Sequence, residues 1–150
     1  MTTDLGGPER WRPIAYTAIA NRLQAKRIVE ALQRQGYLVL EHATGFHLVA
    51  SLADVIEGAG RNTLVWPHLI VADVRSPGCS GASIANGLRD LGIEIPIILI
   101  AGEHDPVPPR ERMFVVEAAA AAVRVPELAK HWAPIRLLDR TREPERMLAS

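Results

Sequence analysis

Residues 67–81, with the sequence PHLIVADVRSPGCSG, join a near-continuous apolar run to a single carboxylate and a turn. An apolar run of this kind is typical of a strand that is buried on both faces, as in a parallel sheet. Asp73 stands at the carboxyl end of the run, and Pro77-Gly78 follows as a turn. In open parallel sheets the carboxyl ends of the strands line the crevice where ligands bind. Asp73 is therefore the first candidate for a functional residue.

Segments of strand pattern and of helix pattern alternate along the rest of the chain. Strands are predicted at 14–20, 37–40, 67–73, 95–101 and 120–125, and helices at 21–36, 45–58, 82–91, 110–119 and 127–138. Five such units predict a parallel sheet with helices on both faces. The fold class is α/β, a doubly wound five-stranded parallel sheet with strand order 2-1-3-4-5. The predicted domain spans 14–138, between a flexible N-terminal arm at 1–13 and a C-terminal tail at 139–150.

The composition excludes several classes of protein. The chain has 150 residues, of which 48% are hydrophobic and 23% charged, as in an ordinary globular domain. Its 17 basic and 17 acidic residues give no net charge, so no nucleic-acid partner is predicted. Cys79 is the single cysteine and cannot form an internal disulfide. No apolar run reaches the roughly 20 residues of a membrane helix and no secretory leader is recognisable, so we expect a cytoplasmic protein without membrane contact.

Four features, in this order and spacing, resemble the receiver domain of bacterial response regulators. They are the Gly36-Tyr37 end of the first helix, the strand that ends at Asp73, the Pro77-Gly78-x-Ser80-Gly81 turn and the strand that contains Pro96. The resemblance covers about 14–138 and implies the flavodoxin-like fold of that family. It also implies a role in two-component signalling, with Asp73 equivalent to the aspartate that accepts a phosphoryl group.

The same resemblance implies a magnesium site, but the acidic ligands are missing. Receiver domains hold the metal with the acceptor aspartate and an adjacent acidic pair at the end of the first strand. Counting back from Gly36 places this pair on Ile19 and Ala20, and a shift of one residue brings in Asn21. Aliphatic side chains cannot bind a metal, and one neutral amide cannot replace two carboxylates. We therefore expect no cofactor, and weak or absent Mg²⁺ binding.

The groups that contact the phosphoryl group in receiver domains are missing too. The hydroxyl residue at the end of the fourth strand corresponds to Ala101, five residues after Pro96. The lysine that precedes a proline at the end of the fifth strand corresponds to Val125, and the aromatic switch residue corresponds to Ala122. Arg124 cannot replace the lysine, because a side chain one position earlier on a strand points to the opposite face.

These losses predict a degenerate receiver domain. Losing one preorganised donor at a site where charge develops typically costs about a hundred- to a thousandfold in rate. We interpret the chain as a protein-interaction module in two-component or phosphorelay signalling, which is not an enzyme and lacks normal magnesium-dependent phosphorylation. The expected partners are a kinase, an output protein, or a second copy bound through the face of the fourth helix, the fifth strand and the fifth helix.

Two alternatives stay open at this point. In the first, the chain is a genuine receiver that accepts phosphate slowly at Asp73. In the second, it is a flavodoxin-like domain that binds a small molecule in the same crevice, which Ile19, Ala20 and Ala101 would widen. Phosphorylation of Asp73 would distinguish a slow but genuine receiver from a degenerate one. Binding of a small molecule in the crevice would support the second alternative.

Overall fold

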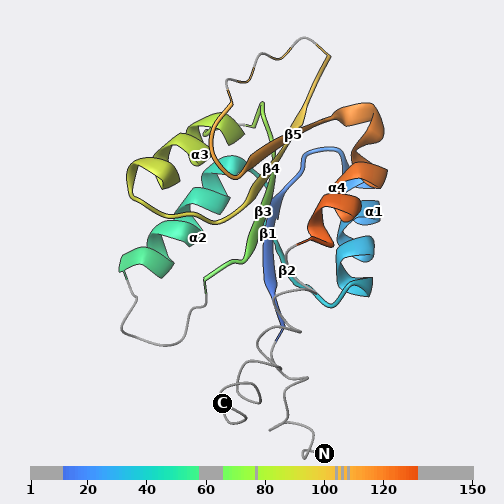
Figure 1. Cartoon of the computed structure of the whole chain (residues 1–150), viewed down its shortest axis with the longest axis horizontal. Helices are drawn as coiled ribbons and strands as arrows, with labels where there is room; N and C mark the ends of the chain where they lie inside the picture. The colour runs from blue at the N-terminus through green and yellow to red at the C-terminus, as the bar shows by residue number, and fades with distance from the viewer. Residues whose placement is uncertain are drawn as a thin grey trace, which may run out of the picture.

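One five-stranded parallel sheet forms the centre of the molecule. The computed structural model describes residues 12–57, 66–76, 78–103, 105, 107 and 109–131. The strands follow the order β2-β1-β3-β4-β5, and every neighbouring pair is parallel (Figure 1). The strands are β1 (Ile14–Ala18), β2 (Leu38–Glu41), β3 (Leu69–Asp73), β4 (Ile97–Ala101) and β5 (Met113–Glu117). The predicted fold class and strand order are confirmed.

Helices cover both faces of this sheet. Helices α1 (Arg22–Arg34) and α4 (Ala121–Ala129) lie on one face, and α2 (Gly45–Glu57) and α3 (Gly81–Asp90) lie on the other (Figure 1). No helix in the described part of the chain has the length and apolar character needed to cross a membrane. Most of the predicted arm and all of the predicted tail lie outside the described residues, so the domain boundaries stay predictions.

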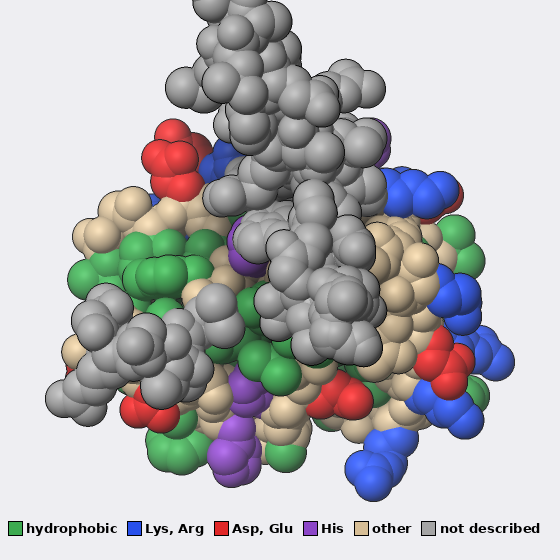
Figure 2. Space-filling model, turned by 90° about the horizontal axis from the view of Figure 1, so that it is seen from below, with side chains coloured by type: hydrophobic (Ala, Val, Ile, Leu, Met, Phe, Trp, Pro, Cys, Tyr) green, Lys and Arg blue, Asp and Glu red, His purple; other side chains and the backbone are tan. Residues whose placement is uncertain are grey.

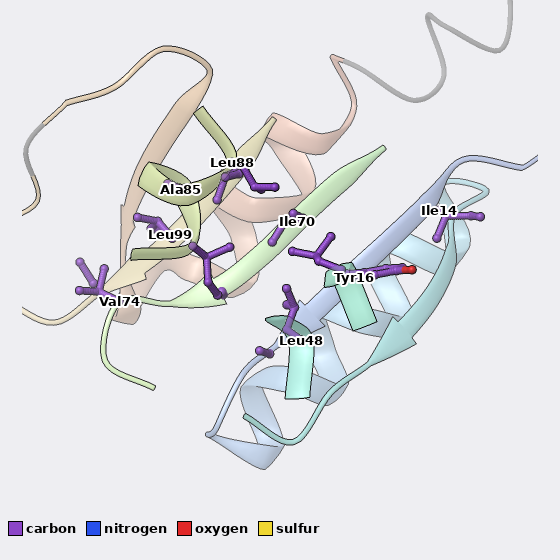
Figure 3. Packing of buried hydrophobic residues seen from close by; sticks show 14 residues of the cluster. Ile14, Tyr16, Leu48, Ile70, Val74, Ala85, Leu88 and Leu99 are labelled. Atoms are coloured by element: carbon purple, nitrogen blue, oxygen red, sulfur yellow. The ribbon is translucent and has the colours of Figure 1, made fainter. Parts of the chain in front are cut away.

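Side-chain alternation along the strands divides the apolar core into two layers. Tyr16, Ile70 and Leu99 point to one face, where they meet Leu48 of α2 and Leu88 of α3 (Figure 3). The second layer, on the α1 and α4 side, contains Ala15, Val71, Ile98, Ile28, Leu32 and Val125. Because β1, β3 and β4 are buried on both faces, their sequences are almost continuously apolar.

The last strand differs from the prediction. β5 occupies Met113–Glu117, where the sequence pattern predicts a helix at 110–119, and α4 occupies most of the strand predicted at 120–125. The reason is local, because Phe and Val favour strands whereas the alanines from Ala118 onward have the highest helix propensity. These alanines begin as a short 3₁₀ turn, η3 (Ala118–Ala120), that leads into α4. The predicted fourth helix and fifth strand are therefore wrong.

The connection from β4 to β5 has no helix in its described residues. It spans 102–112, and Val107 packs from it against the core layer on the α2 and α3 side. The helix predicted to start at Glu127 begins instead at Ala121 and contains Pro126, while 132–138 lie outside the described residues. β5 therefore has a helix against one of its faces and only part of a loop against the other.

The last helix is fixed to the first by polar contacts as well as by packing. The Tyr37 hydroxyl donates to the carbonyl oxygen of Ala129 at 2.9 Å, and the Gln35 side-chain amide donates to that of Pro126, also at 2.9 Å. Tyr37 is buried and follows directly after the turn that ends α1. These bonds join residues more than 90 positions apart and close the layer between α1 and α4.

Arg89 joins the segments that precede β4 and β5 through hydrogen bonds to their backbone. From the end of α3, its guanidinium donates to the carbonyl oxygens of Glu111 and Ile93 at 2.7 Å, Ile95 at 2.9 Å and Arg112 at 3.0 Å. These acceptors belong to the α3–β4 loop and to the segment that enters β5. One side chain therefore fixes the start of β4 and the start of β5 at the amino edge of the sheet, and a planar guanidinium suits this because its donors point along fixed directions.

Candidate functional site

Asp73 ends β3 at the carboxyl edge of the sheet, as predicted. Its side chain is half-buried, and its Oδ2 accepts a hydrogen bond of 2.7 Å from the backbone N–H of Ala20. Burial raises the pKa of the Asp73 carboxyl above its ordinary value, and the bond from Ala20 opposes this rise. The loop after β1 therefore reaches the carboxylate with a backbone amide, at the place where a receiver domain has acidic side chains.

The pocket beside Asp73 has a volume of about 430 Å³. Its wall is built by the β1–α1 loop, the first turn of α1, the ends of β3 and β4, and η3. The Gln24 side chain forms part of this wall, and its amide donates to the carbonyl oxygen of Ala118 at 2.7 Å. The charged side chains that line the pocket are Asp73, Arg75 and Asp105.

Arg75 and Asp105 form an ion pair at the mouth of this pocket. The Arg75 side chain is 79% exposed, whereas that of Asp105 is only 9% exposed. The second carboxylate oxygen of Asp105 accepts a hydrogen bond of 2.8 Å from the backbone N–H of Gly102. The pair therefore ties the β4–β5 connection to the β3–α3 loop. The sequence pattern does not reveal this pair, because nothing in it shows that residues 30 positions apart come together.

The three residues at the positions of the acidic pair, Ile19, Ala20 and Asn21, place no carboxylate beside Asp73. Ile19 is buried against the α1 side of the core, and Ala20 contributes only its backbone N–H. The Asn21 side-chain oxygen caps α1 by accepting from the backbone N–H of Gln24 at 2.9 Å. Among the described residues, no group of three or more His, Cys, Asp or Glu side chains is placed to hold a metal ion.

The structure agrees with the predicted end of β4 but changes which residue stands at the end of β5. Ala101 ends β4 as predicted and is buried, so no hydroxyl is present there. Ala122 and Val125 lie on α4, so their assignment to the fifth strand is wrong. The residue at the end of β5, in register with Ala101, is Glu117, and three positions before it stands Phe114. A carboxylate therefore occupies the end of the strand where the receiver resemblance expects a lysine.

Solved structures of receiver domains share this architecture. The signal receiver domain of a histidine kinase from Syntrophus aciditrophicus aligns with 87% of this chain and 93% of its own, with a TM-score of 0.62 and 21% identity. The response regulator TrrA from Thermotoga maritima, solved in complex with Mg²⁺ and BeF, aligns with 79% of this chain and 97% of its own, with a TM-score of 0.61 and 19% identity. The chain has the fold of a response-regulator receiver domain.

A transcriptional regulatory protein is similar in sequence over a shorter range. The C4-dicarboxylate transport transcriptional regulatory protein DctD of Pseudomonas aeruginosa is 33% identical over 57 residues. The match covers 38% of this chain but only 12% of DctD, so the chain spans a small part of that regulator. No protein-family model matches the chain.

The donor set of this receiver-fold site does not fit a magnesium ion. Mg²⁺ requires oxygen ligands in near-octahedral geometry, and carboxylates are its usual protein ligands. Asp73 is a carboxylate in the expected position, but one of its oxygens already accepts from Ala20. The nearby Asp105 has one oxygen on Arg75 and the other on Gly102. A metal here would therefore compete with Arg75 and with two backbone N–H groups for the carboxylate oxygens.

We expect the substitution Asp73→Asn to raise the free energy of unfolding at neutral pH. Because burial raises the pKa of Asp73 in the folded state, folding is disfavoured at pH values above that pKa and is unaffected once both states are protonated. The gain should therefore shrink as the pH falls to about 4 and below. Urea unfolding of both proteins across this pH range measures it.

The matched control for this prediction is Asp54→Asn, which changes an exposed aspartate on α2. This variant should leave the free energy of unfolding within about 0.5 kcal/mol of the parent at every pH. If Asp73→Asn lowers stability at neutral pH, the bond from Ala20 to the charged carboxylate outweighs the cost of its burial.

Proposed function

We propose that the chain is a receiver-fold interaction module of two-component or phosphorelay signalling that works without normal magnesium-dependent phosphorylation. The observation that carries the proposal is the surroundings of Asp73. A backbone N–H from Ala20 contacts the carboxylate, while Ala101 and Glu117 end the two strands beyond β3. The fold is retained, and the chemical groups that would support phosphoryl transfer are replaced.

Charge supports the same proposal. A phosphoryl group brings about 1.5 to 2 negative charges at neutral pH and is stabilised by cations or N–H donors. The pocket offers Arg75, which is held by Asp105, and the end of β5, two strands away from β3, carries the acidic Glu117. Each lost donor typically costs about a hundred- to a thousandfold in rate. Phosphorylation of Asp73 is therefore expected to be too slow to carry a signal.

The partner we propose is a signalling protein, such as a kinase or an output protein. Helix α1 supports this role because it presents four basic side chains, Arg22, Lys26, Arg27 and Arg34, against one acidic residue, Glu30. Lysine and arginine side chains gather on the side of the molecule where α1 lies (Figure 2). An acidic protein surface suits this helix. We propose a cytoplasmic role without enzymatic activity, nucleic-acid binding or membrane contact.

The proposal is tested by incubating the protein with Mg²⁺ and acetyl phosphate, or with beryllofluoride. Intact mass and thermal unfolding are expected to stay unchanged, because the described residues that line the pocket include no lysine and no side-chain hydroxyl beside Asp73. TrrA, which was solved with Mg²⁺ and BeF, is the positive control in the same assay. A stoichiometric gain of one phosphoryl group that Asp73→Asn abolishes would show a genuine, slow receiver instead.

The pocket itself favours a second candidate function, the binding of a small molecule. Its volume of about 430 Å³ lies within the range of small-molecule sites, and Asp73, Gln24 and Arg75 supply polar groups of different kinds. A thermal-shift screen of metabolites, repeated with Asp73→Asn and Gln24→Ala, tests it. A stabilising compound whose effect both substitutions reduce would support this function, and a compound that stabilises all three proteins equally would exclude this pocket.

A further inference from the structure

The outer edge of β5, up to Val115, carries backbone groups without partners in the described part of the chain. The Ile97 N–H donates to the carbonyl oxygen of Arg112 at 3.0 Å. This bond determines which residues of β5 direct their backbone N–H and C=O groups toward β4 and which direct them away from it. Phe114 and Val116 then direct their backbone groups toward β4, and Met113, Val115 and Glu117 direct theirs outward. Among the described residues, no loop, helix or side chain hydrogen-bonds to the outward groups of Met113 and Val115, whereas Glu117 is the N-cap of η3 and its carbonyl oxygen belongs to the first turn of that helix.

This edge lacks the features that normally protect an edge strand. Natural edge strands carry prolines, lysines, inward-pointing charges or a covering helix. Residues 113–116 are Met-Phe-Val-Val, and the side chains of Phe114 and Val115 are 37% and 45% exposed. Met113 packs on the α2 and α3 side of the sheet and Val116 on the other, so alternation places Val115 on the α2 and α3 side. Val115 is exposed because no helix follows β4 in the described chain to cover it.

We propose that β5 pairs with β5 of a second copy of this chain, in antiparallel orientation about a two-fold axis at Val115. The two sheets then form one continuous sheet, with Val115 opposite its equivalent and Met113 opposite Glu117 of the other copy. Every outward N–H and C=O group of the strand finds a partner in this register. The aromatic and β-branched side chains on either side of the axis make favourable cross-strand pairs.

The charges identify a second copy as the occupant. The chain has no net charge, so two copies do not repel each other at a distance. The lead-in at 110–112 carries one net positive charge, and the strand ends at the exposed Glu117. Antiparallel pairing brings the basic lead-in of each copy toward the acidic end of the other, twice in one dimer. Two-fold symmetry therefore closes the assembly at two copies and leaves the β2 edges unused.

This inference deepens the proposed interaction role and rests on it for biological meaning, but its test is separate. Assembly is measured without Mg²⁺ or acetyl phosphate. Asp73→Asn is expected to dimerise like the parent chain, whatever the outcome of the phosphorylation experiment. Failure of one proposal therefore leaves the other intact.

Sedimentation velocity over a concentration series tests the dimer. The parent chain should dimerise reversibly, and Val115→Lys should raise the dissociation constant by about a hundredfold or more, because it places two like charges opposite each other at the axis. The control is Leu40→Lys, which changes a residue of similar exposure, 40%, on the β2 edge and should leave the dimer unchanged. Circular dichroism and thermal unfolding establish that both variants fold.

Crosslinking tests the position of the axis. Residues in a hydrogen-bonded antiparallel pair lie about 5.5 Å apart between Cα atoms, which suits a disulfide. Mild oxidation should therefore give a covalent dimer of Val115→Cys, but not of Leu40→Cys, with Cys79 present in both. A chain that stays monomeric into the millimolar range, a dimer that survives Val115→Lys, or equal crosslinking of the two cysteine variants overturns the proposal. Binding of an extended peptide by a monomeric chain also overturns it.

Discussion

Replacing Arg89 with alanine is expected to lower the free energy of unfolding by about 3 kcal/mol. The guanidinium donates to four backbone carbonyl oxygens, and hydrogen bonds from a charged donor are worth about 1.5 to 3 kcal/mol each. Because Arg89 is half-buried, water replaces part of this loss. In the variant, the segments that precede β4 and β5 lose the hydrogen bonds that hold them together. The backbone amides of β5 should therefore be the first in the sheet to lose protection from hydrogen exchange.

Arg89→Lys separates the geometry of this contact from its charge. A lysine keeps the charge but presents its donors from one atom, so it cannot reach carbonyls on both segments as a planar fork does. It should recover less than half of the lost stability. Arg27→Ala, on the exposed face of α1, is the control and should stay within about 0.5 kcal/mol of the parent. Denaturant unfolding measures all three variants, and an Arg89→Lys variant as stable as the parent would contradict this account.

Two glycines of the same helix, α3, should respond to alanine with opposite signs. A Cβ atom at Gly81 would lie 2.6 Å from Leu99 Cδ2 and 2.7 Å from the carbonyl oxygen of Asp73, both in the buried sheet. Gly81→Ala should therefore destabilise the protein by about 3 kcal/mol, as overpacking against backbone does. A Cβ atom at Gly87 meets nothing within 4 Å. Gly87→Ala should stabilise by about 0.5 to 1 kcal/mol, because alanine favours a helix over glycine.

The Gly81 contact also explains how α3 approaches the functional edge so closely. The Gly81 N–H donates to the carbonyl oxygen of Val74 at 3.1 Å, so the first turn of α3 lies directly on the residues that follow β3. Thermal unfolding of the two alanine variants checks the predicted signs. Equal effects of the two substitutions would mean that α3 moves away from the sheet at little cost.

Most of the fold was predictable because its strongest signals are local. β1, β3 and β4 are apolar along their length, and Asn21 at the start of α1 and Gly36 after its end mark that helix. Gly36 adopts a φ of 103°, a conformation that glycine reaches without a steric cost. Since periods and caps act within a few residues, sequence reasoning recovers them without knowledge of tertiary contacts.

β5 was not predictable in the same way. The sequence from Arg110 to Ala122 combines three strand-favouring residues, Phe114, Val115 and Val116, with a run of alanines, and a helix that starts early explains the apolar spacing almost as well. The structure resolves the choice through long-range contacts. Val116 fills the layer under α4, and Ile97 bonds to the carbonyl of Arg112. Misplacing β5 also misplaced the lysine position, which is why Glu117 was overlooked.

The residue types at the site can be read from the sequence, whereas the contacts that these residues make cannot. The absence of acidic residues at Ile19 and Ala20 follows from spacing along the chain. The N–H of Ala20 on Asp73 and the pair between Arg75 and Asp105 depend on loop conformation, which spacing does not determine.

The contacts between α1 and α4 have a consequence for the order in which the chain can fold during synthesis. α1 needs α4 to cover its apolar side, and the buried Tyr37 needs the carbonyl of Ala129 for its hydroxyl. A ribosome delivers these two elements almost a hundred residues apart. Until α4 leaves the exit tunnel, the nascent chain exposes an unfinished apolar surface to which chaperones and other nascent chains can bind.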